Sequence, residues 1–206
     1  MGMRIRKKWD LPSEQTAALA ILAAAFLLGG IAGSVFVSVS SEAGAQELSG
    51  YLTGYLELAE TEDLPRSLWQ VLWGQLKFSL GALALGLTGL GVIGLPVLFG
   101  VRGFFFVFPV ACFVRVFGGS GFFPAFLLLG LSALLWAPAL FLIGVSGFLS
   151  AQRQLRRSMG EGRGEIPTGG AYWSRAGLCV GLSLAAGLLE FWVVPVLLRA
   201  GARIVL

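Results

Sequence analysis

The sequence from Thr16 to Val39 reads TAALAILAAAFLLGGIAGSVFVSV and contains no charged residue. About 20 apolar residues in a helix cross the roughly 30 Å of hydrocarbon in a bilayer, so this run predicts a transmembrane helix. Four basic residues precede it: Arg4, Arg6, Lys7 and Lys8. A basic start, an apolar run and the small residues Ala43-Gly44-Ala45 also fit a cleaved signal peptide. The length of the run favours a helix that stays in the membrane.

The rest of the chain has the same apolar character. Hydrophobic residues make up 56% of its 206 residues and charged residues 13%, and the mean hydropathy is +0.83. A soluble core does not absorb that much apolar surface, and 30 glycines suit helices that pack closely in a membrane. We therefore predict an all-α fold: one membrane domain over 1–206, built as a polytopic helix bundle.

Charge-free runs predict about five transmembrane helices. They cover residues 16–39, 78–99, 102–117, 125–149 and 176–198. Lysine and arginine concentrate in short cytoplasmic loops, and the loop 152–175 contains five arginines. If segment 102–124 crosses the membrane, this loop lies on the same side as the basic N-terminus; if the segment is re-entrant, it does not. The crossing layout is favoured, with the N-terminus inside and the C-terminus outside.

Segment 42–66, expected on the outer side, is acidic and amphipathic. Four of its apolar and aromatic residues recur near helical spacing: Leu48, Tyr51, Leu52 and Tyr55. They are a candidate surface for a protein partner. The alternative is a helix that lies in the headgroup region and contacts membrane lipid.

No residue set in the sequence predicts a catalytic centre. Histidine is absent, and Cys112 and Cys179 both fall within apolar runs, where thiols act as small hydrophobic groups. The sequence therefore predicts no enzyme activity, no cofactor and no metal site. The net charge of +4 comes from clusters beside apolar runs, which are typical of topology signals and do not indicate a nucleic-acid partner.

Two charges fall within the expected spans. Arg115 lies 13 residues after Arg102, and Glu190 lies 15 residues after Arg175, which places both about 20 Å from the cytoplasmic ends of their helices. An intramembrane pair of Arg115 with Glu190 would offset the cost of burying each charge. The alternatives are that each side chain reaches the headgroups separately, or that Lys77 is the partner of Glu190.

Small residues recur four apart on three expected helices: Gly29 with Gly33, Ala82 with Gly86, and Gly177 with Gly181. Such pairs let two helix backbones approach closely. We expect most of them to pack helices within the chain, and the remainder to be available for contacts between chains.

The positions Gly94-Leu95-Pro96, Arg102-Gly103, Glu190 and Pro195 resemble the stage II sporulation protein M family in order and spacing. The charged Arg115 departs from the family pattern. The resemblance implies a non-enzymatic scaffold in the mother-cell membrane at the sporulation septum. Its expected partners are other sporulation membrane proteins, including the peptidoglycan hydrolases of engulfment: an amidase and a glycan-cleaving enzyme. The alternative is a small transporter or channel component that uses Arg115 and Glu190 as pathway residues.

The arginine distribution predicts the topology directly. A reporter fused after Arg157 should stay in the cytoplasm, whereas reporters inserted near Gly44 or fused after Leu206 should be exported, because the helices between these points cross an odd number of times. Paired alkaline phosphatase and fluorescent protein fusions measure this. An exported reporter at Arg157 would instead favour the re-entrant layout.

Overall fold

The computed structural model describes residues 13–40, 44, 46–47, 50, 67–159 and 170–205. Within these ranges the regular elements are all helical, which confirms the predicted all-α bundle. The long helices are α1 (Ser13–Val39), α3 (Leu68–Gly86), α4 (Gly91–Phe117), α6 (Leu131–Ser158) and α7 (Gly170–Val205). Three short helical segments join α4 to α6: η1 (Gly118–Gly121), α5 (Phe122–Ala125) and η2 (Phe126–Gly130).

Four helices in the described ranges are long and apolar enough to cross a membrane, namely α1, α4, α6 and α7. Helix α3 is shorter, with 19 residues, and carries Gln70, Gln75 and Lys77. At 1.5 Å per residue it still measures about 28 Å, close to the thickness of the hydrocarbon layer. We therefore treat α3 as the fifth helix of the membrane bundle.

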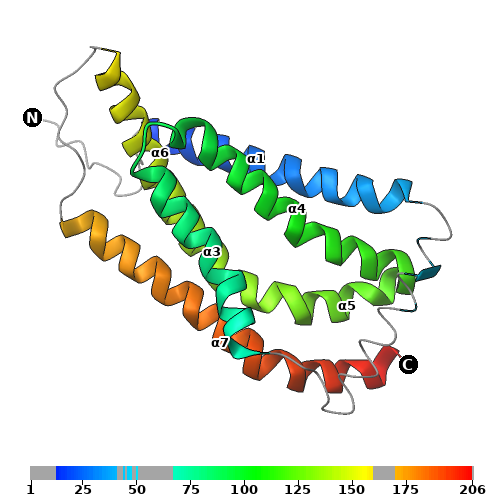
Figure 1. Cartoon of the computed structure of the whole chain (residues 1–206). Helices are drawn as coiled ribbons and strands as arrows, with labels where there is room; N and C mark the ends of the chain where they lie inside the picture. Colours follow the sequence, from blue (N-terminus) through cyan, green and yellow to red (C-terminus); the bar gives the residue numbers. More distant parts are fainter. Residues whose placement is uncertain are drawn as a thin grey trace, which may run out of the picture.

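The helices alternate in direction along the chain. In Figure 1, α1 and α4 lie side by side and run the same way as α7, while α3 and α6 run back. Glu14 in α1 and Arg156 in α6 line one cleft, so the start of α1 and the end of α6 meet at one end of the bundle. Helix α4 has 27 residues, about 40 Å, which suffices for a complete crossing. This arrangement favours the crossing layout over the re-entrant one.

The predicted boundary between the second and third spans is wrong. The spans 78–99 and 102–117 do not meet at Arg102; α3 ends at Gly86, and α4 continues unbroken from Gly91. Arg102 separates the two predicted spans in the sequence, but in the structure it lies inside α4, as does Pro96; prolines are tolerated within membrane helices. The real turn covers residues 87–90, where Thr88 Oγ1 donates a hydrogen bond to Leu85 O at 3.1 Å.

The helices on either side of the basic loop also extend further than predicted. The span 125–149 continues to Ser158 in α6, and the span 176–198 lies inside the longer α7. The loop 152–175 is correspondingly shorter, and Arg156 and Arg157 lie in the last turn of α6, where cations interact favourably with the helix dipole.

The predicted partner surface lies outside the described residues: Leu48, Tyr51, Leu52 and Tyr55.

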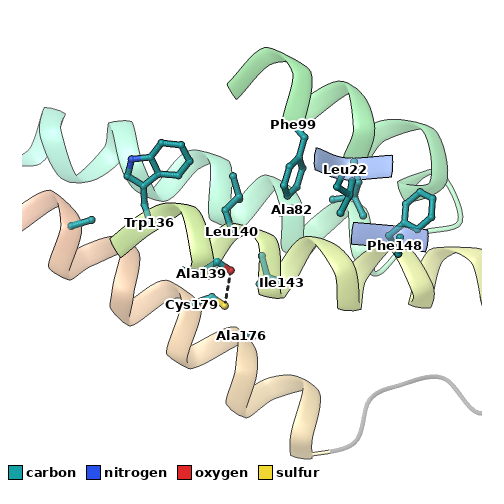
Figure 2. Packing of buried hydrophobic residues seen from close by; sticks show 13 residues of the cluster. Leu22, Ala82, Phe99, Trp136, Ala139, Leu140, Ile143, Phe148, Ala176 and Cys179 are labelled. Carbon is teal, nitrogen blue, oxygen red and sulfur yellow. Dashed lines mark hydrogen bonds between the residues drawn. The ribbon is translucent and has the colours of Figure 1, made fainter. Parts of the chain in front are cut away.

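Helix α6 occupies the centre of the bundle. Half of its most apolar stretch is buried, against 28% or less for the other three apolar spans. Leu140 and Ile143 of α6 pack with Leu22 of α1 and Phe99 of α4 in one apolar cluster (Figure 2). Across the opposite side of α6, the thiol of Cys179 donates a hydrogen bond to Ala139 O at 3.0 Å. The core therefore links α6 to α1, α4 and α7, and through Ala82 also to α3.

Glycines allow α1 and α4 to touch backbone to backbone. A Cβ atom on Gly29 would overlap the carbonyl of Gly100, and one on Gly103 would overlap the carbonyl of Phe26. Gly33 faces Phe104 of α4 in the same way. The Gly29 and Gly33 pair thus packs helices within the chain, as predicted.

The other two small-residue pairs differ from each other. Ala82 and Gly86 of α3 lie against Gly147 of α6, so this pair also packs within the chain. At Gly177 and Gly181 of α7, no described atom beyond the local backbone of that helix lies within 4 Å of where a Cβ would be. Two of the three pairs thus pack helices within the chain, as expected for most of them, and Gly177 with Gly181 forms the remainder in the described structure.

The variants Gly29→Ala and Gly103→Ala should each destabilise the bundle by about 1–3 kcal/mol, because the new methyl group collides with backbone that cannot move independently. Gly181→Ala is the matched control, since its methyl group enters open space. Unfolding of the purified protein in detergent, followed by circular dichroism, measures the difference. Equal stability of all three variants would contradict the close α1–α4 contact.

Candidate intramembrane polar site

A chain of hydrogen bonds joins three helices inside the bundle. Arg102 of α4 donates from Nη2 to Gln75 Oε1 of α3 at 2.6 Å. The amide Nε2 of the same glutamine donates to Glu190 Oε2 of α7 at 2.7 Å. Gln75 therefore uses both ends of its amide to connect an arginine with a carboxylate. The two opposite charges compensate each other through this bridge.

Two aromatic rings enclose the guanidinium of Arg102. Its Cζ lies 4.0 Å from the ring centroid of Trp136 and 4.5 Å from that of Phe78. Trp136 projects from α6 and is only 4% exposed (Figure 2). Cation–π contacts of this kind strengthen when water is excluded, so the rings help to hold the cation within the bundle. Arg102 Nε is buried and has no hydrogen-bond partner among the described atoms.

The contact between α3 and α7 continues the polar line one helical turn further. Ser79 Oγ and Ser183 Oγ share a hydrogen bond of 2.6 Å, and both side chains are buried. Between the two contacts, Gly187 packs against Leu72 and Gln75. In hydrocarbon these bonds satisfy groups that water cannot reach, so they fix the register of α3 against α7.

A cavity of about 300 Å³ adjoins the hydrogen-bonded chain. Its lining comes from α3, α4, η2, α6 and α7, and includes Gln70, Lys77, Phe105, Ser132, Trp136 and Glu190. Lys77 Nζ lies 5.3 Å from the ring centroid of Phe78, the same ring that contacts Arg102. The polar site is therefore bordered by a hollow with two cations and one carboxylate in its wall.

Arg115 and Glu190 do not form the predicted pair, because each binds other residues. Arg115 donates from Nη1 to Ser40 Oγ at 2.6 Å and to Val37 O, and from Nη2 to Ser40 O at 2.8 Å. These carbonyls end α1, and they have no partner within that helix. Arg115 thus caps the end of α1, whereas Glu190 binds Gln75.

The predicted pair of Arg115 with Glu190 is wrong because the helix that contains Arg115 begins at Gly91 and not at Arg102. The predicted depth assumes that Arg102 is at the cytoplasmic end of a helix, whereas it lies 11 residues, or about 16 Å, after the start of α4. Arg115 is therefore about 36 Å from that start, at the far end of the helix. Lys77, the alternative partner, lines the same cavity as Glu190 but does not bond to it in the described structure.

Three of the family-pattern positions form packing contacts. Leu95 is fully buried, Gly94 faces Leu85, and Gly103 allows the α1–α4 contact. Pro195 belongs to α7, but its side chain is outside the described set.

Arg102 and Glu190, far apart in sequence, meet through Gln75. The sequence reading missed this glutamine. Its signal was a polar amide two residues before Lys77, within a helix that is otherwise largely apolar, where such a group requires a partner.

The helices and their buried polar site define a polytopic α-helical membrane protein. The sequence model of the family described as Stage II sporulation protein M matches residues 22–195, so the chain belongs to that family and is a sporulation-related membrane protein. The matched region includes Gln75, Arg102 and Glu190, and it confirms the resemblance drawn from the sequence. No curated protein and no solved structure matches the chain.

Double-mutant cycles should reveal which charges and amides interact. Gln75→Leu and Glu190→Leu remove two ends of one hydrogen bond, so their effects on the free energy of unfolding should be non-additive by about 0.5–3 kcal/mol. Arg115→Gln and Glu190→Leu have no common partner and should add within about 0.5 kcal/mol. Denaturant titration in mixed micelles provides the values. Strong coupling of Arg115 with Glu190 would contradict the observed contacts.

Proposed function

We propose that the chain is a non-enzymatic membrane scaffold that anchors a peptidoglycan-degrading complex during spore engulfment. Membership of the family supports a sporulation role. The proposed location is the mother-cell membrane at the septum. An amidase and a glycan-cleaving enzyme would supply the hydrolytic chemistry as partners through protein–protein interaction.

The observation that supports this proposal is that interior polar groups form hydrogen bonds between helices. Gln75 bonds to residues of two other helices, Ser79 bonds to Ser183, and Cys179 bonds to a backbone carbonyl of α6. Each of these contacts joins one helix to another. A set of groups arranged to fix helices relative to each other suits a rigid anchor. Within the described ranges, no three metal-ligating side chains come together.

The alternative of a small transporter or channel requires a path along which Arg115 and Glu190 both act. Arg115 is bound to the end of α1, and Glu190 is bound to Gln75 of α3. The two side chains therefore do not border a common polar path in the described structure. This separation favours the scaffold over the transporter.

The scaffold proposal predicts complementation and co-purification. In a sporulating bacterium that lacks its own family member, the tagged chain should restore engulfment and co-purify with cell-wall hydrolases from membranes. The triple variant Tyr51→Ser, Leu52→Ser, Tyr55→Ser should lose recruitment at an unchanged membrane level, because it removes apolar contacts from the outer segment. Fluorescence microscopy of engulfing membranes and mass spectrometry of the purified complex provide the readouts.

A matched variant separates loss of docking from loss of folding. Gly103→Ala disturbs the α1–α4 contact, so it should lower the membrane level and the recruitment together. If the wild-type chain is stable in the membrane but recruits no hydrolase, the scaffold proposal fails. If the triple variant recruits hydrolases as well as the wild-type chain does, the docking surface lies elsewhere on the protein.

A further inference from the structure

The cavity beside Gln75 has an excess of positive charge. The charges of Arg102 and Glu190 compensate each other through the glutamine amide. Lys77 also lines the cavity, and in the described part of the chain its ammonium group has no carboxylate or other acceptor within bonding distance. One positive charge thus remains uncompensated at the rim of the cavity. An anion in the cavity would offset that cost.

Donor groups for an anion are already in place. Arg102 lines the cavity, and the rings of Trp136 and Phe78 hold its guanidinium in place, with centroids 4.0 and 4.5 Å from Cζ. The ammonium of Lys77 approaches the face of Phe78, the ring that it shares with Arg102. An arginine and a lysine that line one hollow are suited to phosphate oxygens, which accept hydrogen bonds from both groups.

The exposed lining residues show from which direction a ligand would enter. Lys77 and Phe105 are exposed, Phe105 by 58%, whereas Trp136 is buried at the inner wall. Gln70, also exposed, lies in the first turn of α3 beside the stacked pair Trp69 and Trp73. Exposed tryptophans at the end of a membrane helix are typical of the lipid–water interface. The cavity therefore extends from headgroup level inward along the lipid-facing side of the bundle.

We propose that this cavity binds the phosphate group of an anionic membrane lipid. The phosphate would contact Lys77 at the rim and the guanidinium of Arg102 at the inner wall, and the acyl chains would lie along the exposed ring of Phe105. A volume of about 300 Å³ corresponds to about ten water molecules and lies at the lower limit of typical ligand pockets, which suits one headgroup. This site is separate from the proposed outer docking segment.

The test uses the full-length protein purified in a neutral detergent. Short-chain phosphatidic acid, phosphatidylcholine of equal chain length and inorganic phosphate are added separately, and binding is followed by thermal unfolding and native mass spectrometry. We expect phosphatidic acid to bind and raise the unfolding temperature, whereas phosphatidylcholine, whose phosphate is balanced by its own cation, should bind far more weakly. An equal shift with inorganic phosphate would assign the site to the free ion and overturn the lipid as its source.

Charge-matched variants locate the site. Lys77→Gln should weaken phosphatidic acid binding about tenfold, because one charged hydrogen bond is lost, and Lys77→Arg should restore it. Lys77 is exposed, so neither change should lower stability in the absence of lipid. Arg156→Gln removes the same charge at the opposite end of the bundle and should leave binding unchanged. Full binding by Lys77→Gln, or an equal loss in Arg156→Gln, would overturn the proposal.

Discussion

The two hydrogen bonds of Gln75 are the interactions on which the arrangement of α3, α4 and α7 depends. A lone charge near the middle of a membrane helix costs roughly 2.5–3.5 kcal/mol on insertion scales. The amide of Gln75 accepts a hydrogen bond from Arg102 and donates one to Glu190. The two opposite charges thereby offset this cost for each other without direct contact. All three helices must therefore take fixed positions before both hydrogen bonds of Gln75 can form.

The apolar contacts support this polar junction from the other side of the bundle. Helix α6 lies at the centre and places Trp136 against the guanidinium of Arg102. Helix α1 reaches α4 only because Gly29 and Gly103 allow backbone contact. In lipid the hydrophobic effect does not drive helices together, so close packing and interhelical hydrogen bonds have to do so. The contacts at glycine and the bonds of Gln75 are examples of these two forces in one molecule.

The same junction connects the family assignment with both proposals. Arg102 and Glu190 belong to the pattern by which the sequence resembles the stage II sporulation protein M family, and the structure gives them a joint role in fixing the bundle. A bundle fixed in this way suits an anchor for partner enzymes. Among the described residues Lys77 at the adjoining cavity has no counter-charge, and in our proposal a lipid phosphate would supply it.

The sequence by itself determined the all-α membrane class, the family and most of the helices, because long charge-free runs can only be buried as membrane helices. It also indicated that Gly29 and Gly33 pack a helix. It misplaced the turn before α4 because a buried arginine has the same appearance in sequence as one in a loop. Groups that bond to each other, such as Gln75 and Glu190 or Arg115 and Ser40, are separated by at least 75 residues, so their contacts follow from the packing of the helices and not from sequence spacing.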